Sequence, residues 1–231
     1  MRLATLREGD GGMDKINKTF DGYALYYDLF NSEKPYRKEI EFVYKWANKP
    51  ESIFDIGCGT GSYWKYYPKN TRIIGIDKSP SMVNRSRGLI VDADIQEFDM
   101  RIFTGFKCAT ALFDVINYIP KHDWWARVPL EKDGYFIFDI WDAKKIQKDG
   151  FEKTIKIMDD KVRIINPISW NKKYVDLSVN ISGKGILGFE ERHRMYLHSH
   201  KDIEKFCGSS FKIEEIKPTE RWQTWFKLKR R

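Results

Sequence analysis

The feature that most constrains the fold is a short apolar run that ends in closely spaced glycines. Residues 52–56 read Ser-Ile-Phe-Asp-Ile, and Gly57, Gly59 and Gly61 follow at every second position. An apolar run of this length before glycines predicts a buried strand that leads into a tight turn. Because glycines carry no side chain, the backbone of this turn can approach a ligand closely, so the turn is a candidate binding site.

The segments around the turn alternate between strand-like and helix-like patterns. An amphipathic helix is expected between Pro35 and Pro50, and a second helix is expected to begin at Ser79. Aromatic residues at helical spacing predict a further helix over residues 18–31. Such alternation with short connections predicts an α/β fold with a doubly wound parallel sheet, whose ligands bind beyond the carboxyl ends of the strands. The expected strands of this part are residues 52–56, 72–76, 89–91, 108–116 and 134–139.

Residues 152–198 interrupt this alternation after the fifth strand. Strand-like stretches joined by turn residues predict an antiparallel β insertion there. A helix that begins near Ser199 and two more strands, over 211–216 and 224–228, are expected to complete the core. The expected domains are a flexible leader over 1–12, a core over 13–151, the insertion over 152–198 as a lid or dimer surface, and the rest of the core over 199–231.

Carboxylates stand at the ends of three expected strands. Asp55 precedes the first glycine, Asp77 ends the second strand, and Asp94 follows the third strand. Because the carboxyl ends of parallel strands meet at one edge of the sheet, we expect these side chains to lie near the glycine turn. A carboxylate at Asp77 can accept hydrogen bonds from both hydroxyls of a ribose, and Asp94 can bond an adenine amino group. The acids therefore predict an adenosine-containing ligand.

Three segments in order resemble the cofactor motifs of class I S-adenosylmethionine (SAM)-dependent methyltransferases. They are residues 55–61 (Asp-Ile-Gly-Cys-Gly-Thr-Gly), 75–82 (Gly-Ile-Asp-Lys-Ser-Pro-Ser-Met) and 92–98 (Asp-Ala-Asp-Ile-Gln-Glu-Phe). The resemblance covers residues 20–231 and implies a Rossmann-like sheet of seven strands, the last of them antiparallel, with SAM as cofactor. The cofactor-binding residues that it and the strand ends imply are Tyr27, Tyr36, Asp55, Gly57, Gly59, Gly61, Asp77, Lys78, Met82, Asp94, Ile95, Leu112 and Phe113.

Residues 109–118, 136–142 and 190–196 resemble a subgroup of these enzymes that acts on small molecules, including the amino groups of sugars. This resemblance implies in-line transfer of a methyl group to a small-molecule acceptor, such as an amino sugar or another small amine. The catalytic candidates are Tyr118, Glu191 and His193, and the candidates for substrate contact are Asp139 and Trp141. Each has a structural alternative: an orienting role for Tyr118, because tyrosine is a poor base at neutral pH, and a satisfied structural histidine at His193.

The net charge of +8 leaves a second function open. A basic protein can bind nucleic acid, but most of the basic residues are scattered, as on a solvated surface. Enzymes that methylate the amino groups of bases resemble one another in an Asn/Asp-Pro-Pro-Tyr/Phe motif after the fourth strand, and residues 117–120 (Asn-Tyr-Ile-Pro) differ from it. Enzymes that methylate carbon five of pyrimidines need a nucleophilic cysteine after that strand, whereas Cys108 begins it. A small-molecule acceptor is therefore favoured over nucleic acid. An RNA or nucleic-acid methyltransferase and a non-catalytic SAM-binding subunit remain the alternatives.

Composition bounds the remaining expectations. The chain has 3 cysteines, far apart and without metal-ligand spacing, so we expect neither a metal site nor disulfides. No apolar run approaches the length of a membrane span, and the N-terminus lacks the apolar core of a signal peptide. A cytoplasmic protein without a membrane partner is expected, either a monomer or a homodimer.

Overall fold

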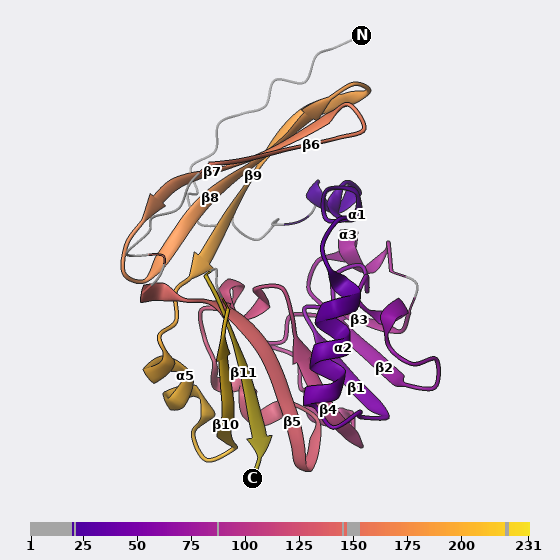
Figure 1. Ribbon diagram of the computed structural model, residues 1–231, viewed down its shortest axis with the longest axis vertical. Helices are drawn as coiled ribbons and strands as arrows, with labels where there is room; N and C mark the ends of the chain where they lie inside the picture. The colour runs from indigo at the N-terminus through magenta and orange to yellow at the C-terminus, as the bar shows by residue number, and fades with distance from the viewer. Residues whose placement is uncertain (1–19, 21, 87, 145, 147–152, 220–221) are drawn as a thin grey trace.

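The computed structural model describes residues 20, 22–86, 88–144, 146, 153–219 and 222–231, which form two sheets (Figure 1). The larger sheet has seven strands in the order β10-β11-β5-β4-β1-β2-β3. β11 runs antiparallel to both of its neighbours, and the other strand pairs are parallel. This confirms the predicted mostly parallel sheet with an antiparallel last strand. The strands are β1 (Ser52–Ile56), β2 (Arg72–Asp77), β3 (Ile90–Asp92), β4 (Phe106–Ala111), β5 (Leu130–Trp141), β10 (Phe211–Pro218) and β11 (Gln223–Arg230).

Helices and helical turns lie along the connections of this sheet. α2 (Tyr36–Trp46) follows Pro35 as predicted. α3 (Pro80–Val83) begins at Ser79, whose hydroxyl accepts a hydrogen bond from a backbone amide of the first turn, and α5 (His200–Cys207) begins with a capping box. In the described part of the chain, no helix is long and apolar enough to cross a membrane. The 3-10 turns that follow α2 are η3 (Trp64–Tyr66), η4 (Met100–Ile102), η5 (Val115–Tyr118) and η6 (Asp123–Arg127).

The core of the large sheet has two sides because successive strand residues point to opposite faces. Along β5, Phe136 and Phe138 pack with the fully buried Trp124 and Trp125 on the side of α5. Ile137 packs with α2 on the other side. The two tryptophans therefore cover the sheet.

Two expected elements differ in the structure. The strand expected over 108–116 ends at Ala111, because Phe113 and Asp114 have φ of 69° and 65° and turn the chain out of the sheet. The helix expected over 18–31 is two short pieces, η2 (Tyr23–Leu25) and α1 (Tyr27–Phe30), and residues 18, 19 and 21 lie outside the described residues. Phe20 has φ of 75°, which excludes a helical start at that position.

The insertion forms a separate antiparallel sheet in the order β6-β7-β8-β9. Figure 1 shows it above one end of the large sheet, with the N-terminal helices beside the space between the sheets. Its strands fall within the expected 152–198, and the domain boundaries themselves stay a prediction, since the leader over 1–12 lies outside the described residues. The strands are β6 (Thr154–Met158), β7 (Lys161–Trp170), β8 (Tyr174–Gly183) and β9 (Ile186–Tyr196).

Candidate functional site

A cavity of about 250 Å³ lies at the carboxyl ends of β1, β2 and β3, where residues of β9 also line it. Many of the residues proposed for cofactor binding border it, and so does one of the catalytic candidates. These lining residues are Tyr27, Gly57, Gly59, Asp77, Lys78, Met82, Asp94, Ile95, Leu112, Phe113 and Tyr118. The structure thus brings together residues that the sequence places on five separate segments.

The glycine turn closes the end of β1 over the end of β2. The amides of Gly57 and Cys58 both donate to the carbonyl of Ile76, at 2.8 and 3.2 Å. Gly57 and Gly59 have φ of 63° and 56°, a backbone conformation that costs little only for glycine. A Cβ on Gly59 would meet nothing closer than 3.9 Å, so the backbone here faces open space in which a ligand can lie.

Asp77, at the end of β2, lies next to this turn and lines the cavity. Its two carboxylate oxygens accept hydrogen bonds from the amides of Gly59 (2.8 Å) and Ser79 (2.9 Å). Burial raises the pKa of Asp77, and these two hydrogen bonds oppose the rise. Each carboxylate oxygen has a second lone pair, so Asp77 can still accept two hydroxyl donors from a ligand.

Asp94 and Ile95 form the neighbouring wall. Asp94 accepts the amide of Gln96 at 2.9 Å, and the ammonium of Lys78 lies 4.0 Å from its other oxygen. The guanidinium of Arg127 donates hydrogen bonds to the carbonyls of Ile95 (3.2 Å) and Gln96 (2.8 Å) and so holds the backbone of this wall in place. An apolar side chain beside a carboxylate suits a purine ring that carries an amino group.

A second cavity of about 20 Å³ shares Tyr27, the first two glycines of the turn and the residues after β4 with the large cavity. Tyr36 and Asp55 line this second cavity only. Asp55 is held by the Trp64 indole (2.7 Å) and the Thr110 hydroxyl (2.7 Å), and burial raises its pKa to about 6. We therefore expect Asp55 to act mainly by supporting the turn.

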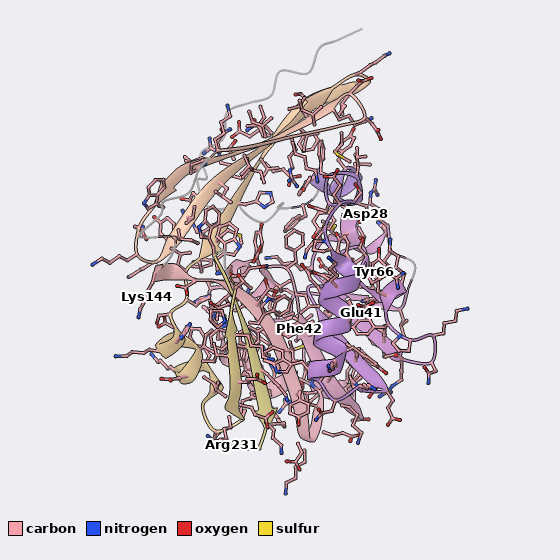
Figure 2. The ribbon with its side chains drawn as sticks, in the orientation of Figure 1. Asp28, Glu41, Phe42, Tyr66, Lys144 and Arg231 are labelled. Atoms are coloured by element: carbon pink, nitrogen blue, oxygen red, sulfur yellow. The ribbon has the colours of Figure 1, made fainter. Side chains whose placement is uncertain are left out.

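One polar contact at the turn was not found from the sequence, and one glycine of the turn lies away from the cavities. Asp28 of α1, which is labelled in Figure 2, accepts hydrogen bonds from the hydroxyls of Thr60 (2.8 Å) and Ser62 (2.6 Å). Gly61 borders neither cavity. A Cβ on Gly61 would lie 3.3 Å from the ring of Trp64. Gly61 thus lies on the side of the turn away from the cavity.

The three catalytic candidates meet in space. Tyr118 lines the large cavity, and its hydroxyl lies 2.9 Å from Nδ1 of His193. Nε2 of His193 lies 3.4 Å from a carboxylate oxygen of Glu191. His193 and Glu191 do not border the cavity themselves, so they can act on a ligand only through neighbouring residues such as Tyr118.

The two candidates for substrate contact lie outside both cavities. Asp139 is fully buried, and its carboxylate accepts the amides of Phe113 (2.7 Å) and Asp114 (3.2 Å), the residues that turn the chain after β4. Trp141 packs in a cluster with residues of the antiparallel sheet such as Val175. Neither borders the cavity, because the end of β5 is covered by the turn after β4 and by the insertion.

The sequence pattern missed several residues that line the cavity. Arg194 is held by two hydrogen bonds to Asp176 (2.7 and 2.9 Å), which aligns its guanidinium. The pattern of charged residues along β9 does not indicate that the end of this strand lines the cavity. The lining residues missed are Phe20, Ile76, Ser79, Ala93, Gln96, Val115, Ile119, Pro120, Arg194 and Tyr196.

The fold and the site define a class: a Rossmann-like sheet with a glycine turn and an acid at the end of the second strand. Residues 54–129 match the family model of a methyltransferase domain. Both findings agree with the resemblance that the sequence motifs carry: this segment of the chain matches a methyltransferase domain.

Known proteins extend the match. A protein of Geobacillus sp. that carries the name of a methyltransferase is 26% identical over 147 aligned residues, which cover 55% of this chain and 60% of that protein. The chain thus matches less than two thirds of that relative's length. A SAM-dependent methyltransferase from Clostridium acetobutylicum has the same fold, with a TM-score of 0.73, 19% identity, and 91% of this chain and 98% of that chain covered. An amino pentose methyltransferase from Micromonospora echinaspora, bound to SAM, gives a TM-score of 0.70, 15% identity and coverage of 92% and 98%.

Proposed function

We propose that this protein is a SAM-dependent methyltransferase that transfers a methyl group to a small-molecule acceptor, such as an amino sugar or another small amine. One observation supports this most strongly. A single cavity is lined both by Asp77 and Asp94, which suit an adenosine, and by Tyr118, which is joined to an imidazole. A site of this kind can hold a nucleoside-bearing methyl donor and an acceptor next to each other.

The residues of the cavity fit the cofactor. Asp77 has free lone pairs for the ribose hydroxyls, and Met82 and Ile95 supply apolar surface for the adenine. The second cavity beside the turn suits the methionine part of the cofactor, with Tyr36 in its wall. When bound, SAM supplies an electrophilic methyl group on a sulfonium sulfur. The aromatic faces of Tyr27 and Phe113, which line both cavities, favour such a positive charge.

A small acceptor is supported by what covers the cavity. Phe20 and the β9 residues Arg194 and Tyr196 border it together with Tyr118, so it lies between the insertion and the large sheet. The similar amino pentose methyltransferase also points to an amine on a sugar. A base within a folded RNA would have to enter between these two sheets, which favours the small acceptor.

The cofactor assignment is tested by calorimetry with S-adenosylhomocysteine (SAH), the demethylated product. We expect binding near micromolar affinity, about 8 kcal/mol. Asp77→Asn is expected to weaken it about 10- to 100-fold, because the amide cannot accept from both ribose hydroxyls while it also holds the turn. Asp92→Asn is the matched control, since Asp92 pairs with Asp77 in the neighbouring strand but is exposed and outside the cavity. Equal affinities of the wild type and Asp77→Asn would exclude the ribose contact.

The acceptor is tested by following SAH formation with free and nucleotide-linked amino sugars, simple amines, tRNA and ribosomal RNA. Methylation of an amino sugar or a small amine supports the proposal. Turnover of an RNA substrate with salt-dependent binding would establish the nucleic-acid alternative instead. SAH binding without turnover of any of these acceptors, with methylation recovered only on adding a partner protein, would identify a non-catalytic SAM-binding subunit.

A further inference from the structure

Behind Tyr118, three polar side chains from distant parts of the chain form a line. The Tyr118 hydroxyl lies 2.9 Å from Nδ1 of His193, and Nε2 of the same ring lies 3.4 Å from Oε2 of Glu191. The side chain of His193 is 2% exposed, and within the described part of the chain its Nε2 has no hydrogen-bond partner at normal distance. A buried ring nitrogen without a hydrogen bond costs free energy, so such an atom usually has a function or forms a closer hydrogen bond when a ligand binds.

Glu191 is fixed as an ionised group by the N-terminal segment. Its carboxylate accepts the amides of Phe20 (2.9 Å), Gly22 (2.6 Å) and Tyr23 (2.8 Å). Burial alone would raise the pKa of Glu191, but the contact with His193 and the backbone hydrogen bonds outweigh it and hold the pKa below its usual value. An ionised carboxylate can only accept, so the nitrogen of His193 that faces it carries the proton.

This fixes the roles along the line. In a ring that carries its single proton on Nε2, Nδ1 is an acceptor, and Tyr118 donates its hydroxyl proton to it. The tyrosine oxygen then keeps its own lone pairs, and Tyr118 lines the cavity. The hydroxyl is thus ready to receive a proton from a bound ligand while it gives its own proton to the ring.

We propose that Tyr118, His193 and Glu191 form a proton outlet, and that the acceptor of this site is therefore bound as a protonated amine. The inference rests on the proposed function, because it assigns the acceptor class of the same site. An ammonium group has no lone pair and must lose a proton before it can attack. Tyr118 is the residue that touches the acceptor, and His193 and Glu191 are positioning residues that act through it.

The step balances as follows. The ammonium gives one proton to the Tyr118 oxygen while the tyrosine proton moves to Nδ1 of His193, which becomes an imidazolium beside the Glu191 carboxylate. The freed lone pair forms the nitrogen–carbon bond, the sulfur–carbon bond breaks, and its electron pair stays on sulfur. Burial raises the pKa of Tyr118 well above its usual value, so the tyrosine passes a proton on without ionising.

The N-terminal segment shields this line from solvent. The ring of Phe20 lies 4.9 Å from the His193 ring and 5.2 Å from the Tyr118 ring, measured between centroids. The titratable groups that face His193 are Tyr118 from η5, Tyr23 from η2 and Glu191 of its own strand. Because Glu191 also holds the backbone of the segment that carries Phe20, one carboxylate fixes both the shield and the ring.

The first test reads the proton on the ring directly. In SAH-bound protein with 15N-labelled histidine, the resonances of His193 are assigned by their loss in His193→Gln. We expect a single neutral form with the proton on Nε2, and in Tyr118→Phe a change at Nδ1 only. Glu191→Gln is expected to give a mixture of both neutral forms, whereas Glu190→Gln, the exposed neighbour on the same strand, leaves the spectrum unchanged. A proton on Nδ1 in the wild type would overturn the proposal, because the ring could not then receive one from Tyr118.

The second test is the pH dependence of turnover with 3-amino-3-deoxyglucose as the probe. Near neutral pH we expect Tyr118→Phe to lower kcat about 100-fold with SAH affinity nearly unchanged. The deficit should shrink at alkaline pH, where the free amine needs no proton outlet. A loss of the same size at every pH indicates a merely structural tyrosine and contradicts the proposal. Failure of the wild type to bind SAH would instead refute the proposed function, and the form of the His193 ring, recorded then on the ligand-free protein, would still decide the proton outlet.

Discussion

Gly57→Ala is expected to destabilise the protein by about 2–5 kcal/mol and to abolish SAH binding. The left-handed backbone, with φ of 63°, costs an alanine about 1–2 kcal/mol. The new Cβ would also lie 2.5 Å from Cγ1 and 2.7 Å from Cγ2 of Val115, and overpacking of this kind costs about 1–3 kcal/mol more. Urea unfolding without ligand measures the loss of stability, and calorimetry measures SAH binding.

The matched control is Gly59→Ala in the same turn. Its φ is 56°, but its Cβ would approach no atom closer than 3.9 Å, so only the backbone cost of about 1–2 kcal/mol is expected. The double variant Gly57→Ala/Val115→Ala should recover the part of the loss that comes from the clash. If Gly57→Ala and Gly59→Ala lose the same stability, the close packing of β1 against η5 is not what requires Gly57.

Acid is expected to destabilise the protein through His122, by about 2 kcal/mol at pH 5 relative to pH 7. Burial, and then the neighbouring His198, lower the pKa of His122 from 6.5 to about 3. Below pH 6.5 the unfolded chain takes up a proton that the folded chain excludes, so stability falls as the pH drops from 6.5 toward 3. The ring is 7% exposed, stacks on Phe206 at 3.9 Å, and lies 3.3 Å from Nε2 of His198, which leaves no room for hydration of the charged form.

His122→Gln is the variant that isolates this effect. It removes the titrating ring, so its unfolding free energy should fall less between pH 7 and pH 5 than that of the wild type, although lost stacking lowers it at neutral pH. His200→Gln is the control, because His200 is exposed on α5 and should leave the slope unchanged. The burial argument fails if His122→Gln is as acid-sensitive as the wild type.

The grouping of the glycine turn with the acids at the strand ends could be predicted because its signals are local. The strand before Gly57 and the acid that ends β2 each follow from a few consecutive residues. The parallel topology then brings the strand ends together. The structure adds that Asp77 stabilises the turn by accepting a hydrogen bond from the Gly59 amide. Asp55 was placed at the right turn, but its bonds to Trp64 and Thr110 show a supporting position.

The acceptor side depended on contacts that no local pattern carries. Tyr118 and His193 are 75 positions apart and meet only because the insertion folds over the end of the large sheet. Alternation along a strand predicts that Glu191 and His193 share a face, but not which face meets another layer. Asp139 follows the same pattern as a ligand-binding strand end and is instead buried by the turn after β4.

The amino-acid sequence by itself determined the sheet, its glycine turn and the acids at its edge, because strand periodicity, glycine conformation and strand order act over short stretches of chain. Only the tertiary structure decided which side chains stand behind Tyr118 and which candidates are closed off from the cavity. The physical reason is that those positions depend on how two sheets and the N-terminal segment pack, and this packing is set by many distant contacts at once.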